Sequence, residues 1–463
     1  MSVPFQAGRL SNFVKEWRKL TSDPNILDIV RGCHIDIQLK DINVMELCAH
    51  KSQYNFNALE AGVIEREIKE LLKLGVIIEV VREEYQVISP IFVREKKNGE
   101  YRMVLNLKKL NQHIPYKHFK MESFELALNL ITTNMFMASV DLRHAYYSIK
   151  IAEEQQKYFC FAWDGQTYQF TCLANGVSEG PRLFTKLLKP VFARLRGMGH
   201  IISGYIDDSL LGGSTFLGCS QNVRDTTMLL SNLGFIINEE KSVLIPTNRI
   251  EYLGNIIDSK EMVVQLPDTR VDKLVRACTM LYEKSVAPIR EVAKVIGLLV
   301  ASFSAVELGK LYYRHLEMAK IQALRMNKGN FNAPMVISDS MKSELCWWIN
   351  NIRVQKRRIV KPHIDVVLYT DASMLGWGAS FNDTNIGGRW TDIEATMHIN
   401  ALELQAIWLA LRSFQRDIQN KHVKLFCDNT TAVNYVNEMG GIHSTVCNEI
   451  SFHIWSWCID HGV

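Results

Sequence analysis

The chain has 463 residues, of which 47% are hydrophobic and 22% charged, and its net charge is +4. This composition is that of a folded globular protein and excludes a disordered chain, and the length predicts roughly three or four structural units. The sequence has no run of about 18 apolar residues and no apolar leader at its start, so it predicts neither a membrane span nor a secretory signal. Its ten cysteines form no CxxC pair, which indicates free thiols and an intracellular protein of the cytoplasm or nucleus.

The first long element is predicted between Asn57 and Val80, where apolar residues recur at helical spacing and Gly75 marks a stop. Two strand-like runs around Asn98-Gly99 then predict a β-hairpin. Short strands and helices alternate to about residue 260, and residues 268–352 are mostly helical in pattern. The basic turn at 355–363 predicts a domain junction, after which a second α/β unit opens at Val366.

Basic side chains cluster after the predicted hairpin begins. Between Pro90 and Lys120 there are eight Lys or Arg residues against two acidic ones, and from Pro181 to Ile206 five against none. Such density beside carboxylates indicates a polyanionic partner. Two solvated faces are the alternative interpretation of the charge runs taken alone.

Two carboxylate sites carry the functional argument. Asp141 closes an apolar strand-like run, and Asp207-Asp208 follow another in GYIDDSLLGG. Nucleotidyl transfer uses two Mg²⁺ ions, which prefer carboxylate oxygens, and adjacent buried carboxylates need such a cation. Side chains alternate along a strand, so we expect Asp207 on the strand to bind directly and Asp208 to reach from the turn. Turn or cap aspartates would explain one of the two sites but not both in this order.

These motifs resemble those of reverse transcriptases, in that family's order over roughly residues 57–260. The resemblance implies that Asp141 is the first metal-binding aspartate and that YIDD (205–208) is the catalytic box. Tyr146 falls at the steric-gate position, where a ring excludes a ribose 2′-hydroxyl. A core or cross-strand aromatic is the alternative for Tyr146.

The resemblance also implies a set of nucleotide contacts. The basic hairpin matches the fingers segment that contacts the triphosphate, FTCLANGVSEGPRLF (170–184) matches the nucleotide- and template-positioning motif, and LGFIINEEKS (233–242) matches the motif whose lysine protonates pyrophosphate. The implied residues are Lys96, Lys97, Arg102, Tyr146, Asn175 and Lys241.

Contacts to nucleic acid follow from the same resemblance. Three basic residues share one face of the helix predicted after Pro181 and would lie along template phosphates, while EYLGNII (251–257) resembles the primer grip. The implied residues are Arg182, Lys186, Lys189, Tyr205, Tyr252, Leu253 and Gly254. Asn106 stands where retroviral enzymes usually have an Asp, so we assign it no role.

The second α/β unit has a carboxylate layout of its own. Asp371 and Asp428 end strand-like runs, and Glu403 lies on a helix, INALELQAIWLAL. This pattern resembles the two-metal nuclease site of ribonuclease H, although Glu403 alone would be an ordinary surface residue of a helix. GGRWT (387–391), INALELQAI and DNTTAV resemble the enzymes of tyrosine-recombinase (DIRS-group) and gypsy-like retrotransposons. No residue matches the family's later His and fourth Asp, so we expect the domain to lack its C-terminal part.

We therefore predict an α/β (α+β) right-hand polymerase followed by a ribonuclease H-like domain. The expected function is RNA- and DNA-templated DNA synthesis, with degradation of the RNA strand of hybrids. A nucleic-acid-binding remnant without activity is the alternative, and Tyr146 and the attached nuclease count against an RNA-templated RNA polymerase. Expected cofactors are two Mg²⁺ per active site, with Mn²⁺ as a substitute. Expected partners are an RNA template, DNA primer/template, RNA/DNA hybrid and dNTPs, with no membrane.

The predicted domains are an N-terminal extension (1–56), fingers and palm (57–262), a helical thumb (263–325), a connection (326–363) and the ribonuclease H-like domain (364–463).

Overall fold

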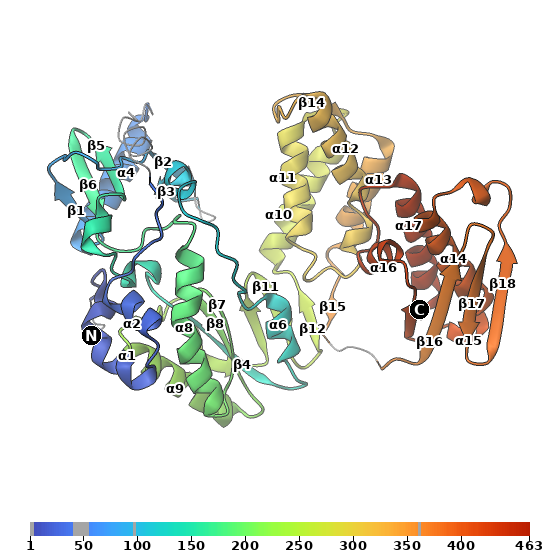
Figure 1. Cartoon of the computed structure of the whole chain (residues 1–463), viewed down its shortest axis with the longest axis horizontal. Coiled ribbons are helices and arrows are strands. Elements are labelled where there is room, and N and C mark those ends of the chain that lie inside the picture. Colours follow the sequence, from blue (N-terminus) through green and yellow to red (C-terminus); the bar gives the residue numbers. More distant parts are fainter. Residues whose placement is uncertain (1–3, 40–54, 96–98, 360–362) are drawn as a thin grey trace. The chain divides into compact units, whose positions relative to one another are not determined.

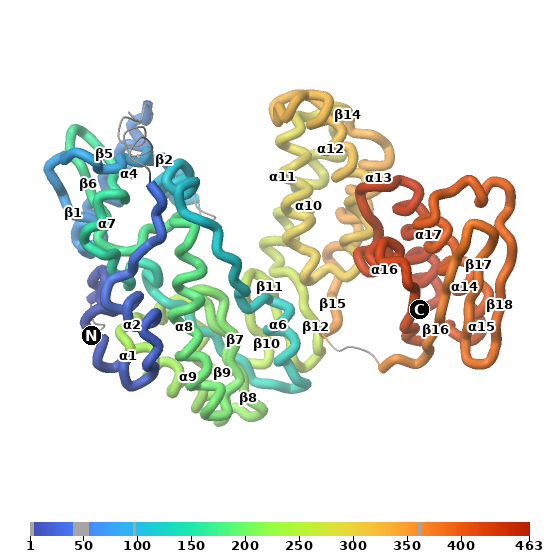
Figure 2. Tube along the Cα trace, viewed as in Figure 1, coloured from blue at the N-terminus to red at the C-terminus, as the bar shows by residue number. Residues whose placement is uncertain are grey.

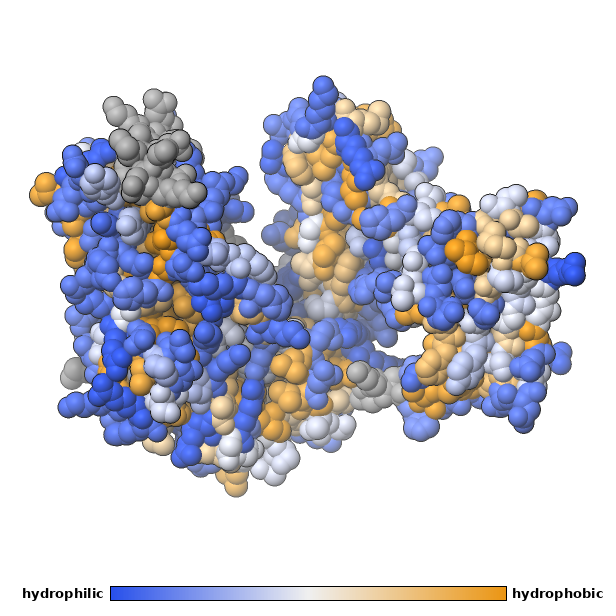
Figure 3. Space-filling model, viewed as in Figure 1, coloured by the Kyte–Doolittle hydropathy of each residue, from blue (hydrophilic) through white to orange (hydrophobic). Residues whose placement is uncertain are grey.

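The computed structural model describes residues 4–39, 55–95, 99–359 and 363–463. The chain divides into two compact units, residues 1–253 and 254–463, and each is a mixture of helices and sheets (Figure 2). On the face seen in Figure 3, hydrophilic residues predominate and apolar residues form separate patches. Among the described residues, no helix has the length and apolar character that crossing a bilayer requires.

The centre of the first unit is a four-stranded antiparallel sheet in the order β7-β8-β4-β9. Two long helices contact it, α8 along β7 and α9 along β8, β4 and β9 (Figure 1). Gly204 allows the close approach of α8, because a Cβ there would lie 2.2 Å from the ring of Phe192. The elements are β4 (Phe136–Asp141), β7 (Ile201–Tyr205), β8 (Asp208–Gly213), β9 (Val243–Thr247), α8 (Gly180–Gly197) and α9 (Phe216–Asn232), with α6 (Phe124–Asn129) beside β7 and β10 (Arg249–Tyr252) beside β4.

A second group of strands lies with helix α4 (Ala58–Lys73), which begins at an Asn57 capping box. The predicted stop is confirmed, since Gly75 has φ 68°, and residues 77–80 continue as a strand. The predicted hairpin is also confirmed, because β2 and β3 pair antiparallel from Ile91–Leu105 to Glu95–Tyr101. The elements are β1 (Ile77–Val80), β5 (Cys160–Trp163) and β6 (Gln166–Phe170) in one sheet, β2 (Ile91–Glu95) and β3 (Tyr101–Leu105) in the hairpin, and the short α5 (Lys108–Asn111), η2 (Tyr146–Ser148) and α7 (Glu153–Gln156).

The segment before these elements, residues 4–38, is here named the N-terminal strap. It contains η1 (Arg9–Phe13), α1 (Val14–Leu20) and α2 (Pro24–Arg31). Leu10, Trp17 and Val30 are fully buried in the same hydrophobic core as β4, α8 and α9. The strap is therefore an integral part of the first unit.

The second unit begins with strands β11 and β12 and four helices, as the mostly helical pattern of residues 268–352 predicted. β12 pairs with β11 and with β15, so Arg357 and Arg358, which lie in the predicted junction, are a strand of this sheet. Residues 360–362 of that junction lie outside the described residues. The elements are β11 (Asn255–Asp258), β12 (Val263–Gln265), β15 (Arg357–Arg358), α10 (Asp268–Tyr282), β13 (Val286–Pro288), α11 (Ile289–Val300), η3 (Gly309–Leu311), α12 (Arg314–Met326), β14 (Pro334–Val336) and α13 (Asp339–Asn351).

The remainder of the second unit is built on the sheet β18-β17-β16-β19. β16 starts at Val366, as expected, and pairs parallel with β19. Helix α14 packs on β16 and β17, and α16 and α17 pack on α14. The elements are β16 (Val366–Ala372), β17 (Gly376–Phe381), β18 (Thr384–Arg389), η4 (Glu394–Thr396), α14 (Ile399–Ser413), α15 (Gln415–Ile418), β19 (Val423–Phe426), α16 (Thr430–Asn437) and α17 (Thr445–His461).

Candidate active sites

The three predicted polymerase carboxylates meet at one end of the sheet in the first unit. Asp141, the last residue of β4, is the direct antiparallel partner of Asp208, the first residue of β8. Partners in such a ladder have Cα atoms about 4.5–5.5 Å apart. The backbone N–H of Leu142 donates to the carbonyl oxygen of Asp207 at 3.0 Å, which places the third residue beside the pair.

The hairpin that presents these carboxylates is strained. Because Tyr205 pairs with Asp208, Ile206 and Asp207 form a two-residue turn. Ile206 has φ 56°, a region that β-branched residues rarely adopt and that costs about 1–3 kcal/mol. The expectation that Asp207 lies on the strand and Asp208 in the turn is therefore wrong, because the tight hairpin reverses their places.

Asp207 and Asp208 ionise less readily than free aspartates. Burial raises the pKa of Asp208 to about 6, and the charges of Asp207 and Asp141 add to this shift. Burial and the charge of Asp141 also raise the pKa of Asp207, and the charge of Lys241 opposes the shift in both. Like charges held in a partly buried edge are stabilised by a bound cation.

Two residues that sequence reasoning missed hold Asp141. The side-chain amide of Asn238 donates to Oδ1 of Asp141 at 2.8 Å, and the backbone N–H of Asp141 donates to Oγ of Ser242 at 3.0 Å. Both lie within the LGFIINEEKS segment, Asn238 before Lys241 and Ser242 directly after it. A polar residue three positions before that lysine was the available signal.

Tyr146 lies next to the carboxylates. Its ring is half-buried and packs on Phe184 with centroids 5.5 Å apart. Burial raises the pKa of Tyr146 to about 12, and Asp207 and Tyr205 contribute through their charges. The predicted gate residue and the predicted catalytic box are therefore neighbours.

Arg102 and Asn175 line a cavity of about 490 Å³, together with His144 and Tyr147. Asn175 donates from its side chain to the hydroxyl of Tyr147 at 3.1 Å. Tyr146 is not among the residues that line this cavity. Lys96 and Lys97, the other predicted triphosphate contacts, lie outside the described residues.

The basic residues of α8 are not equivalent. Arg182 is ion-paired with Glu179, and both Arg182 and Lys186 line a hollow of about 630 Å³ beside Arg31 of α2. Lys189 is exposed and is absent from the lining of that hollow. The structure thus groups two of the three predicted template contacts.

The predicted primer-grip residues lie at the end of β10 and in the turn that follows it. Tyr252 is buried and stacks on Phe124 with ring centroids 6.5 Å apart. Burial, followed by the charge of Asp208, raises its pKa, which places Tyr252 near the carboxylates. Leu253 and Gly254 have φ 48° and 72° and form the turn that follows.

In the second unit, two of the three predicted nuclease carboxylates converge. Ligand atoms of Glu403, Cys427 and Asp428 lie within 4.8 Å of one another. Asp371, near the end of β16, is outside that group, but its charge helps to raise the pKa of Glu403, after burial and the charge of Asp428. Cys427, whose thiol donates to Glu403 at 3.6 Å, was not predicted.

Comparisons with known proteins agree with this geometry. Residues 94–257 match the family model described as reverse transcriptase (RNA-dependent DNA polymerase). The enzymatic polyprotein of soybean chlorotic mottle virus is 28% identical over 264 residues, 52% of this chain and 36% of that protein. The enzymatic polyprotein of figwort mosaic virus is 23% identical over 373 residues, 75% of this chain and 51% of that protein. The chain thus spans about a third to a half of these relatives.

Solved structures show the same fold. The foamy viral protease-reverse transcriptase in complex with RNA/DNA hybrid aligns with 98% of this chain and 62% of its own, at a TM-score of 0.60 and 15% identity. Its dRH form in complex with double-stranded DNA aligns with 99% and 82%, at a TM-score of 0.56 and 16% identity. The expected α/β polymerase fold is confirmed, and residues 94–257 of this chain are a reverse transcriptase domain of the kind found in retroelement and retroviral polyproteins.

Proposed function

We propose that this chain is an RNA- and DNA-templated DNA polymerase with an attached ribonuclease H activity. The convergence of Asp141, Asp207 and Asp208 at the edge of the β4–β8 pair, within a reverse transcriptase domain, carries the proposal. The foamy viral relative has been solved with RNA/DNA hybrid and with double-stranded DNA, which supports the same partners here.

The carboxylate edge fits divalent ions. The raised pKa values of Asp207 and Asp208 are the electrostatic signature of an acidic cluster that a cation would relieve, and hard oxygen donors suit Mg²⁺ or, in its place, Mn²⁺. Asp141, Asp207 and Asp208 would hold the ions. When bound, two such ions activate a primer 3′-hydroxyl and stabilise the charge of a triphosphate.

The surrounding residues supply recognition. Tyr146, whose pKa is raised in part by the charge of Asp207, is assigned to exclude the ribose 2′-hydroxyl. Arg102, which lines the cavity of about 490 Å³, provides the planar cation that would bind a triphosphate oxygen. Lys241 would donate a proton to the leaving pyrophosphate, a role supported by the effect of its charge on both Asp207 and Asp208.

Incorporation of labelled dTTP on poly(A)/oligo(dT) with Mg²⁺ tests the polymerase. Wild type is expected to incorporate label and Asp207→Asn to lose that activity. Asp164→Asn is the matched control, since Asp164 is an exposed turn residue with φ 47°, which Asn tolerates. A chain that binds nucleic acid without activity would give no signal in wild type, and that result excludes the proposal.

The proposed nuclease rests on Asp371, Glu403 and Asp428, supported by the cluster of Glu403 with Asp428 and by the coupling of Glu403 to Asp371. Cleavage of the labelled RNA strand in an RNA/DNA hybrid should be lost in Asp371→Asn. Asp383→Asn, in the exposed β17–β18 turn, is the control. Equal cleavage by Asp371→Asn and wild type would remove Asp371 from the site.

The proposed source of the chain is a retroelement of the tyrosine-recombinase (DIRS) group or its gypsy-like relatives, on the strength of GGRWT (387–391), INALELQAI (399–407) and DNTTAV. The proposed location is inside the cell, in the cytoplasm or nucleus, because Cys33, Cys172, Cys219 and Cys278 are buried free thiols of the kind that persist in a reducing compartment.

A further inference from the structure

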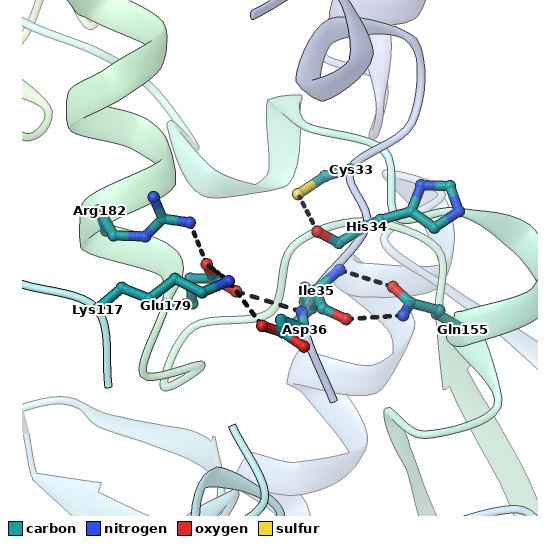
Figure 4. Close-up of polar contacts among 8 residues, drawn as sticks. All are labelled: Cys33, His34, Ile35, Asp36, Lys117, Gln155, Glu179 and Arg182. Carbon is teal, nitrogen blue, oxygen red and sulfur yellow. Dashed lines mark hydrogen bonds and ion pairs between the residues drawn. The ribbon is translucent and has the colours of Figure 1, made fainter. Parts of the chain in front are cut away.

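The N-terminal strap is bonded to the segment that carries Tyr146. The backbone N–H of Gly8 donates to the carbonyl of Tyr147 at 2.8 Å, and that of Cys33 donates to the carbonyl of Lys150 at 2.7 Å. The side chain of Gln155 donates to the carbonyl of Ile35 at 2.8 Å and accepts its N–H at 2.7 Å (Figure 4). The two ends of the strap therefore hold the backbone within the short helix η2, at Tyr147, and just after it, at Lys150.

The strap also reaches the start of α8 through a buried carboxylate. Glu179 is 5% exposed, and its oxygens accept from Arg182, from Lys117 at 3.5 Å and from the backbone N–H of Asp36 at 3.4 Å. Lys117 also forms an ion pair with the Asp36 carboxylate at 2.8 Å, so the lysine bridges two acids (Figure 4). A carboxylate this buried needs cations and hydrogen-bond donors around it. Glu179 therefore links the strap firmly to the start of α8.

The residues that follow Glu179 form the surface on which the Tyr146 ring rests. A Cβ on Gly180 would lie 3.4 Å from Cε1 of Tyr146, and Phe184, one helical turn further, contacts the ring. From the other side, Trp17 of the strap packs on Phe235 with centroids 6.2 Å apart, and Phe235 packs on Phe184 at 6.0 Å. The strap thus supports the ring of Tyr146 through both the start of α8 and its buried face.

We propose that Glu179, anchored by the N-terminal strap, is a positioning residue that sets the ring of Tyr146 and thereby the choice between deoxyribose and ribose. The inference rests on the proposed polymerase function, with Tyr146 as the gate. Excluding one hydroxyl requires a side chain held to within about 0.5 Å. Glu179 and the aromatic contacts supply that constraint, and they are anchored by the N-terminal strap, which lies outside the reverse transcriptase motifs.

The test compares dCTP and CTP on one primer-template with the full chain. Glu179→Gln keeps the shape and removes the charge, so KM for dCTP should rise and the preference for dCTP should fall, each roughly three- to tenfold, the effect of one charge-assisted hydrogen bond. The value of kcat for dCTP should change less. Glu16→Gln, in the exposed Glu16–Lys19 pair of α1, is the matched control and should change neither constant.

Two further variants keep the outcomes distinct. Tyr146→Ala should relax sugar preference, and the double variant with Glu179→Gln should relax it no further, because both act through one ring. Unchanged preference in Tyr146→Ala rejects the gate itself. The positioning role alone is rejected by either of two results, each with relaxed preference in Tyr146→Ala. In the first, Glu179→Gln lowers kcat equally for dCTP and CTP. In the second, the double variant discriminates between the two nucleotides less well than Tyr146→Ala. If Glu179→Gln does not fold, Asp36→Asn replaces it in the same test, because it weakens the Asp36–Lys117 ion pair beside Glu179 and should also lower the preference for dCTP.

Discussion

The side-chain amide of Asn238 donates to Oδ1 of Asp141 at 2.8 Å, and the backbone N–H of Asn238 donates to the backbone carbonyl of Asp141 at 2.9 Å. These two bonds fix both the backbone and the carboxylate direction at the end of β4. The Asp141 carboxylate is thereby held in one orientation beside Asp208, its partner in the β4–β8 ladder. Asn238 thus orders the carboxylate edge although it is no acid itself.

Asn238→Ala should therefore lower kcat and raise the Mg²⁺ concentration needed for half-maximal activity. Loss of a residue that orients a metal ligand costs roughly 10–100-fold, and KM for dNTP should change little. Primer extension at saturating dNTP across a Mg²⁺ titration measures both effects. Asn232→Ala, at the exposed end of α9, is the control. An unchanged kcat and Mg²⁺ midpoint would show that Asn238 plays no part.

The pKa of about 6 for Asp208 predicts how stability depends on pH in the absence of divalent ions. The folded chain ionises Asp208 less readily than the unfolded chain, so it is destabilised as the pH rises from about 4 through 6. Asp208→Asn cannot ionise. It should match wild type near pH 4 and have a Tm higher by about 2–4 °C at pH 7, the shift produced by about 1 kcal/mol.

Thermal unfolding in EDTA buffers from pH 4 to pH 7.5 measures this difference. Adding Mg²⁺ at pH 7 should raise the Tm of wild type more than that of Asp208→Asn, since the ion relieves the repulsion. Asp164→Asn controls for the loss of one surface charge. A Tm difference that is constant over the whole pH range would contradict the assigned cause.

Sugar selection gives a third prediction. Tyr146→Ala should admit CTP, because it removes the ring that packs on Phe184 and is influenced by the charge of Asp207. The preference for dCTP should fall by at least roughly tenfold, the factor that about 1.4 kcal/mol of lost discrimination produces. Competitive incorporation on one primer-template measures the ratio. Tyr158→Ala, in the loop before β5, is the matched aromatic control.

The strands and helices around the site could be predicted because they are local patterns. The apolar runs that end at Asp141 and precede Asp207, the helix stop at Gly75 and the β2–β3 hairpin each depend on residues close in sequence. The direction of the carboxylates could not, since Ile206 adopts a backbone conformation that its residue type disfavours.

The missed contacts are long-range. Asn238 lies 97 positions from Asp141, and Trp17, whose indole N–H donates to the carbonyl of Leu233, lies 216 positions from it. The residue type of Trp17 favours burial, but the local sequence does not indicate that its indole contacts Leu233. For the same reason residues 1–56 read as an extension, whereas the strap is packed into the core of the first unit.

Binding to duplex nucleic acid should weaken steeply with salt and depend little on sequence, because phosphates are the expected contacts. Each phosphate contact contributes about 0.9 to the slope of log affinity against log salt, so Lys189→Gln, on the exposed side of α8, should lower the slope by about one. Fluorescence anisotropy with a labelled duplex between about 50 and 200 mM salt measures the slope. Lys19→Gln, in the exposed Glu16–Lys19 pair, should leave it unchanged. A flat salt response in wild type would contradict phosphate binding altogether, whereas an unchanged slope in Lys189→Gln alone would place the nucleic acid on another face of α8.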